Sequence, residues 1–334
     1  MNSISKYGLV KAASVFLIVF LITACEPHLQ AFKGASITTQ AQNAIDVLPE
    51  NAAYVAMMNT QDLKENEYTD VLGANSLLGR NDVRDLEEQL EEFIAATGFD
   101  PYNDLQEVYV AMEEIKGETP EISAVAYASI DPEQLQNFVK EEAGNELLQR
   151  TYRGVDIFVV DKGLAPSFSF VNEDMIIAAS NTYLLEDMID RLQGEGASLS
   201  GNADMMELVT QASTGQSGWV VAQKPEMNSN MRSSRSLNEF GEMADQVWMA
   251  VDYAVLALNI ESEGLDGQAF LYPNDDVAAE DLSSLMNGMV ALVKASPEVD
   301  QEMLDVLDDI RAKAHGDYVQ VGMYVENDMI EKIR

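Results

Sequence analysis

Histidine and cysteine, the side chains that most often bind metals or transfer protons, are scarce: this 334-residue chain has two histidines and one cysteine. Zinc sites need Cys and His ligands, and a lone cysteine has no partner for an internal disulfide. The phosphate loop Gly-x-x-x-x-Gly-Lys-Ser/Thr is absent, and no Gly-x-Gly-x-x-Gly follows an expected strand. We therefore expect neither a metal nor a cofactor.

Basic residues are also few. The chain has 20 Lys and Arg against 57 Asp and Glu, a formal net charge of −37 at pH 7. This charge repels nucleic acid and anionic membrane faces. Three explanations of the acidity stay open: a surface adapted to high salt, a sink for divalent cations, or a basic protein partner. No Asp-x-Asp-x-Asp-Gly calcium loop occurs, and the closest acidic clusters are Asn274-Asp275-Asp276 and Asp308-Asp309.

An apolar run follows the basic residues Lys6 and Lys11 and covers residues 12–24. It is too short for a transmembrane helix, which needs about 20 apolar residues, and has the length of a signal-peptide core. It ends in Ile22-Thr23-Ala24-Cys25, which resembles the lipobox of bacterial lipoproteins. In that family the small residues admit the signal peptidase, and the cysteine thiol takes the lipid.

The lipobox resemblance implies that Cys25 becomes the first mature residue and is acylated on its sulfur and its amine. More than one acyl chain gives stable membrane anchoring. By the same resemblance, Glu26 favours export to the outer membrane, with the folded part in the periplasm or at the cell surface. The alternative is an ordinary secretory signal followed by an incidental cysteine.

The remaining chain is long enough for one large domain or two modest ones. We expect a signal peptide at 1–24, a flexible tether at 25–46, a first subdomain at 47–195, a linker at 196–218 and a second subdomain at 219–334. Each half shows strand, helix, strand pair, helix and strand. The predicted fold is therefore α+β, with mostly antiparallel sheets and helices on one face, built as two similar split β-α-β, ferredoxin-like subdomains.

Residues 45–334 also resemble a broad group of exported bacterial proteins of unknown function. The resemblance rests on turns and helix caps, and it implies fold and localisation but no reaction or ligand. The motifs that carry it are Leu48-Pro49-Glu50-Asn51, Thr97-Gly98-Phe99-Asp100-Pro101 and Ala278-Ala279-Glu280-Asp281-Leu282.

The sequence gives only weak support for any catalytic residue. We expect His315 at a helix C-terminus, where a cation is favoured by the helix dipole. The segment from Gly215 to Trp219 departs from the Gly-x-Ser-x-Gly elbow of hydrolases, because Trp219 stands where the last glycine belongs. A carboxylate pair for hydrolysis occurs by chance in so acidic a chain. Lys224, Arg232 and Arg235 form the densest local positive charge, and we interpret their loop as a solvated segment or a partner-docking loop.

The sequence thus predicts a lipid-anchored envelope protein, held at the membrane through Cys25, with a non-catalytic binding or scaffolding role toward an unidentified protein partner. The first alternative is a carrier that holds a small or lipidic ligand in a cleft between the two halves. The second alternative is a carboxylate-based hydrolase.

Overall fold

The computed structural model places the described residues in two compact units, within Phe32–Met227 and Asn228–Arg334, hereafter the N-terminal and C-terminal units. The described residues are 37–65, 93–113, 121–143, 147–160, 166–213, 216–223, 246–247, 249–262, 264–275, 277–296, 304, 307 and 310–327.

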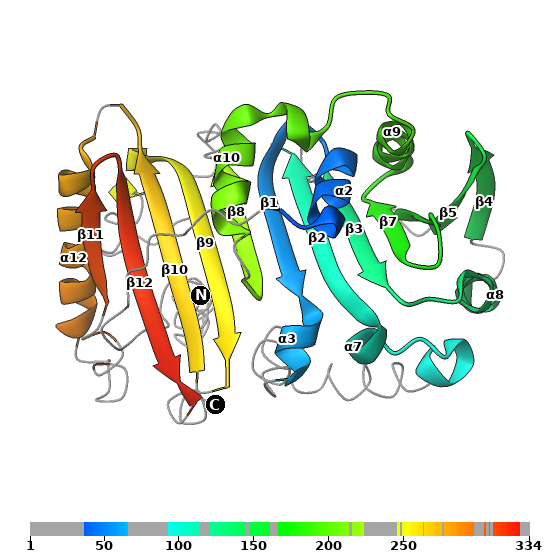
Figure 1. Ribbon diagram of the computed structural model, residues 1–334, viewed down its shortest axis with the longest axis horizontal. Coiled ribbons are helices and arrows are strands. Elements are labelled where there is room, and N and C mark those ends of the chain that lie inside the picture. Colours follow the sequence, from blue (N-terminus) through cyan, green and yellow to red (C-terminus); the bar gives the residue numbers. More distant parts are fainter. Residues whose placement is uncertain are drawn as a thin grey trace, which may run out of the picture. The chain divides into compact units, whose positions relative to one another are not determined.

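The N-terminal unit is built on an antiparallel sheet with the strand order β8-β1-β2-β3-β7-β6-β5-β4 (Figure 1). Its strands are β1 (Ala52–Asn59), β2 (Leu105–Glu113), β3 (Ile122–Ala128), β4 (Leu147–Tyr152), β5 (Val155–Val160), β6 (Ser167–Phe170), β7 (Met175–Ala179) and β8 (Gly218–Gln223). Its helices are α2 (Thr39–Val47), α3 (Thr60–Glu65), α7 (Pro101–Asp104), α8 (Pro132–Ala143), α9 (Thr182–Leu192) and α10 (Ala203–Ala212), with a 3-10 turn, η2, at Leu199–Gly201.

The register of the sheet explains where the core of this unit lies. Met57 on β1 pairs with Trp219 on one side and with Tyr109 on the other, and Tyr109 pairs in turn with Val125. Directly opposed residues point to the same face of a sheet. The row therefore presents large apolar side chains to one face, where α2, α9 and α10 contact the strands (Figure 1).

The C-terminal unit has the strand order β11-β12-β10-β9, with every pair antiparallel. Its elements are β9 (Val251–Glu261), β10 (Gly264–Pro273), α12 (Ala279–Lys294), β11 (Arg311–His315) and β12 (Tyr318–Glu326). Helix α12 buries Leu282 and Met286 against Leu271 and Val319. It also covers the backbone of β11: Asn287 Nδ2 donates to Ala312 O (2.9 Å), and Ala312 N donates to Asn287 Oδ1 (3.1 Å).

These observations confirm the predicted α+β class with antiparallel sheets. The finer expectation of split β-α-β subdomains is met in part. In the C-terminal unit β10, α12 and β11 form a split β-α-β unit, because β12 lies between β10 and β11 and pairs antiparallel with both. In the N-terminal unit β1 pairs directly with β2 and with β8, so no split unit forms there between β1 and β2.

Two predicted boundaries need correction. The expected tether 25–46 contains most of α2, whose Ala44 and Ile45 are fully buried. The expected linker 196–218 contains η2 and α10, which bury Leu199 and Met205. Strand β8, which was expected to open the second subdomain at 219, pairs with β1 and completes the N-terminal unit. The break between the units therefore falls after β8.

Candidate functional site

The residues predicted to carry lipidation and docking all lie outside the described residues, so they stay predictions. They are Ile22, Thr23, Ala24 and Cys25 at the lipobox, and Lys224, Arg232 and Arg235 in the basic loop. No helix within the described ranges is both long and apolar enough to cross a membrane.

The two residues considered for catalysis lie in ordinary structural positions. His315 ends strand β11, not a helix, and its ring stacks on Tyr318 across the turn of the hairpin, with centroids 5.6 Å apart. The helix-dipole role expected for it is therefore wrong. Ser217 is 2 % exposed and lies immediately before strand β8, so it does not stand at an exposed elbow.

A hollow of about 390 Å³ lies in the N-terminal unit where four segments meet. They are the turn before β1, the end of β2, the start of β3 and helix α9. Its volume is in the lower part of the range for small-molecule sites, about 300–1,000 Å³. Carboxylates dominate the described lining: Glu50, Glu113, Glu121 and Asp187.

Arg191 is the single cation in this described lining. Its Nε donates to Val47 O at 2.7 Å, so it caps the C-terminal end of α2, where positive charge is favoured. Its Nη2 atom is buried and has no hydrogen-bond partner. Burial lowers the pKa of Arg191, and the charges of Asp187, Glu113 and Asp190 act in the opposite direction.

The carboxylates near Arg191 do not neutralise it by direct contact. Three ion pairs are found among the described residues, and none of them involves Arg191. Glu113 instead accepts a hydrogen bond from Asn51 Nδ2. Arg191 is half-buried and lines the hollow together with four carboxylates, without a direct ion pair to any of them, so this hollow is a candidate binding site for a charged ligand.

The N-terminus of α9 is also part of the hollow, but it is already capped. Asn181 lines the hollow and accepts a hydrogen bond from Leu184 N at 3.0 Å through its side-chain oxygen. The helix terminus therefore adds no strong anion site of its own.

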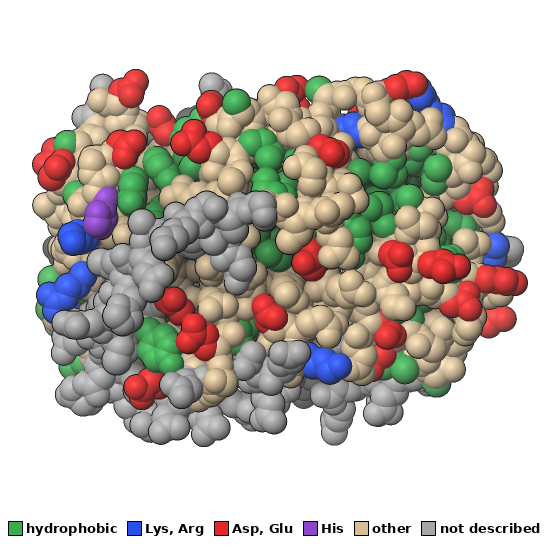
Figure 2. All heavy atoms as spheres, in the orientation of Figure 1, with side chains coloured by type: hydrophobic (Ala, Val, Ile, Leu, Met, Phe, Trp, Pro, Cys, Tyr) green, Lys and Arg blue, Asp and Glu red, His purple; other side chains and the backbone are tan. Residues whose placement is uncertain are grey.

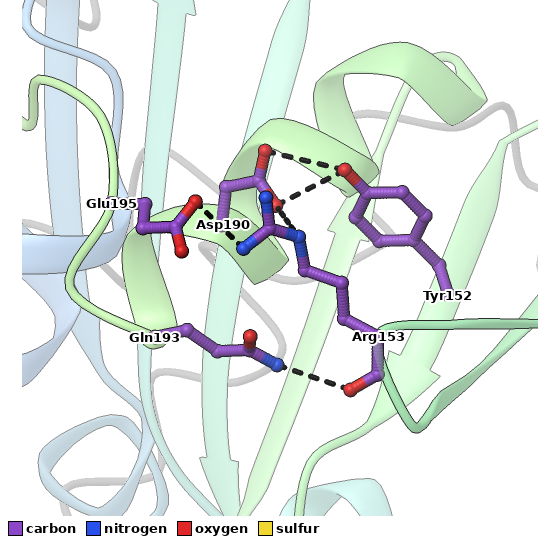
Figure 3. Close-up of polar contacts among 5 residues, drawn as sticks. All are labelled: Tyr152, Arg153, Asp190, Gln193 and Glu195. Carbon is purple, nitrogen blue, oxygen red and sulfur yellow. Dashed lines mark hydrogen bonds and ion pairs between the residues drawn. The ribbon is translucent and has the colours of Figure 1, made fainter.

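A polar cluster, which we call the hairpin latch, holds the other end of α9 (Figure 3). Asp190 accepts from Tyr152 Oη at 3.1 Å and from Arg153 Nε at 2.8 Å. Arg153 also pairs with Glu195 at 2.7 Å, and Gln193 Nε2 donates to Arg153 O at 3.1 Å. The latch joins the β4–β5 hairpin to the turn of α9 that carries Arg191.

The backbone of the hairpin explains how Arg153 reaches α9. Arg153 and Gly154 have φ values of +48° and +85°. Two consecutive residues with positive φ are typical of the two-residue turns whose twist matches that of paired strands. Gly154 adopts this conformation freely, whereas Arg153 is held in it by the ion pairs of the latch.

The charged groups of the described lining are four carboxylates and one guanidinium. The described lining residues include no Ser, Cys, His or Lys that could act as a nucleophile or a proton shuttle near neutral pH. Among the described residues, no group of three or more His, Cys, Asp or Glu is placed to hold a metal ion. What the hollow does offer is one hydrogen-bond donor with positive charge and several anionic acceptors.

Sequence reasoning did not find this hollow. Its residues come from positions 49–51, 113, 121, 181–191 and 197. Acidic residues are so common in this chain that Glu113 and Glu121 carry no local signal. Of these residues, the sequence singled out Pro49, Glu50 and Asn51, as part of a turn motif and not as part of a site.

The chain belongs to the family described as "Protein of unknown function (DUF3352)", whose model matches residues 10–305. This agrees with the expected likeness to a group of proteins of unknown function. No curated protein matches the sequence.

Solved structures similar to this chain include crystal forms of TP0453. Crystal form III is 9 % identical, with a TM-score of 0.50, and the match covers 87 % of this chain and 96 % of that one. Crystal form I is 8 % identical, with a TM-score of 0.49, over 90 % and 97 % of the two chains. At this identity the likeness to form III concerns the fold alone.

Proposed function

We propose that this protein is lipid-anchored in the cell envelope through Cys25 and acts there by binding, without catalysing a reaction. The observation that carries the binding role is the hollow lined by Arg191 and four carboxylates. The sequence Ile22-Thr23-Ala24-Cys25 supports the anchoring.

The charge of the chain supports an envelope role that does not involve nucleic acid. A net charge of −37 opposes contact with phosphate backbones, and it also opposes direct adsorption to anionic lipid. A covalent lipid holds a protein at the membrane in spite of this repulsion. Glu26 after the lipidated cysteine supports the outer membrane as the destination.

The protein partner would be found by crosslinking in living cells, followed by affinity purification and mass spectrometry. We expect the native protein in the membrane fraction with one dominant partner, and Cys25→Ala in the soluble fraction without it. A Cys25→Ala protein that stays in the membrane fraction would contradict the lipid anchor. The absence of any enriched partner would contradict scaffolding and leave small-ligand binding.

The basic loop gives a second arm to this experiment. We propose that Lys224, Arg232 and Arg235 contribute to docking of an acidic surface. A triple charge-neutral variant should lose the crosslinked partner while keeping its membrane fractionation. Unchanged crosslinking by this variant would remove the loop from the proposal.

A second candidate function, carriage of a small ligand, is favoured by the size of the hollow. It differs from the carrier expected from sequence, because the hollow lies within the N-terminal unit and not in a cleft between two halves.

A further inference from the structure

The charges around the hollow limit the kind of ligand it can take. Four carboxylates and one guanidinium line it. A ligand with only negative charge would gain Arg191 but would be repelled by the acidic residues around it. A ligand with only positive charge would be attracted by the carboxylates but repelled by the guanidinium of Arg191.

A ligand that carries both charges satisfies both parts of the lining. We propose that the hollow binds a small zwitterion with an ammonium group and a carboxylate group, that is, an amino acid or a short peptide. The carboxylate is bound by the part of the Arg191 guanidinium that lines the hollow, through a charge-assisted hydrogen bond. The ammonium is bound by the carboxylates of the rim.

Two of the carboxylates lie on other segments than Arg191, and a third lies on the same helix. Arg191 lies on the last turn of α9 and is fixed from one side by its contact with Val47 O. Glu113 and Glu121 belong to β2 and to the residue before β3, and Asp187 lies one turn before Arg191 on the same helix. The opposite charges of a zwitterion can therefore be met at the same time.

The rim of the hollow also carries an aromatic side chain. Tyr183 lines the hollow and is 80 % exposed. An exposed ring beside an acidic hollow is suited to contact an ammonium group through its face.

This inference deepens the proposed binding function and rests on it. It would be tested by isothermal titration of the purified protein with the dipeptide Ala-Ala, with alanine, and with two charge-deleted analogues. The analogues are N-acetyl-Ala-Ala, which lacks the ammonium, and Ala-Ala amide, which lacks the carboxylate. We expect saturable binding of Ala-Ala or alanine, and binding at least about tenfold weaker for both analogues, because each loses a charge-assisted hydrogen bond.

Variants connect this binding to the hollow. Asp187→Asn should weaken the zwitterion about tenfold, whereas Glu207→Gln, an exposed acid on α10 outside the hollow, should leave its affinity unchanged. Arg191→Gln should abolish binding. Arg191 also caps α2, so the circular dichroism spectrum of Arg191→Gln must match that of the native protein before its binding is compared. If the spectra differ, the comparison is made with Asp187→Asn.

Three outcomes would overturn the inference: no heat of binding for either zwitterion, equal affinity for the charge-deleted analogues, or an affinity that Asp187→Asn leaves unchanged. The proposed function is tested separately, by the membrane fractionation of Cys25→Ala. If Asp187→Asn still crosslinks to its protein partner, the envelope role stands without this ligand.

Discussion

Tyr109 and Tyr127 lie side by side on neighbouring strands, with ring centroids 6.2 Å apart and ring planes perpendicular. Both are nearly fully buried, at 1 % and 4 % exposure. Tyr109 Oη donates to Glu107 at 2.8 Å, and Tyr127 Oη donates to Gln40 O on α2 at 3.0 Å. Tyr127 therefore connects the sheet to α2, and Tyr109 packs beside it with its hydroxyl bonded within β2.

Burial, with the charge of Glu107 as a smaller cause, raises the pKa of Tyr127 to about 12, and burial also raises the pKa of Tyr109. The unfolded value is about 10. The folded state thus keeps protons that the unfolded state releases, so stability is complete below about pH 10 and falls as the pH rises through the folded pKa. We expect a steep loss of the urea midpoint above about pH 10.

The control for this alkaline prediction is Tyr127→Phe. It should be less stable than the native protein near neutral pH, because the bond to Gln40 O is lost, but its urea midpoint should fall less steeply in alkali. An identical alkaline slope in the two proteins would exclude Tyr127 as a source of the pH dependence.

The hairpin latch offers a second test at the level of single residues. Tyr152→Phe removes the hydroxyl that donates to Asp190 and should lower the free energy of unfolding by about 1 kcal/mol. The same change at the exposed Tyr183 should stay within about 0.5 kcal/mol of the native value. Urea denaturation of both variants measures the difference, and equal stabilities would mean that the latch contributes nothing to the fold.

At the scale of elements, helix α2 is an integral part of the N-terminal unit. Ile45 is fully buried on it, so Ile45→Ala should lower the free energy of unfolding by about 2–5 kcal/mol. Asn43→Ala on the exposed side of the same helix should be neutral within about 0.5 kcal/mol. Chemical denaturation compares the two, and a neutral Ile45→Ala would instead support the tether that the sequence suggested.

Helices α8, α9 and α10 of the N-terminal unit have local side-chain caps. Asp131 accepts hydrogen bonds from the backbone N–H groups of Glu133 and Gln134 at the start of α8, and Asn181 caps α9. Helix α10 has a comparable cap, since Asn202 accepts from Met205 N at 3.1 Å. Its segment was predicted as a linker because glycine, serine and asparagine dominate the surrounding residues, which favour turns.

Long-range pairing is what the sequence could not supply. The order of strands and helices suggested split β-α-β units. It does not predict that β8 pairs with β1, because most of the N-terminal unit separates these two strands in the sequence. The hollow has the same origin: Glu113 and Arg191 are distant in sequence and meet only because α9 packs beside the β2–β3 end of the sheet. Local patterns determine elements more strongly than they determine neighbours.

At the scale of the whole molecule, the charge is the dominant feature. Acidic side chains are scattered over the face shown in Figure 2 and do not gather in one patch. With a net charge of −37, repulsion among the carboxylates destabilises the folded state, and salt screens this repulsion. The Debye length falls from about 30 Å at 0.01 M salt to about 3 Å at 1 M. We therefore expect the melting temperature to rise continuously with sodium chloride over this range.

The choice of salt separates the explanations of the acidity. Screening depends on ionic strength alone, so potassium chloride should match sodium chloride, and calcium chloride should match both at equal ionic strength. A calcium effect that saturates at low concentration would require bound ions, because binding to the folded state stabilises it by mass action. A melting temperature that does not change with any salt would show that the carboxylates lie far enough apart for water to screen them, and the acidity would then serve a partner and not the fold.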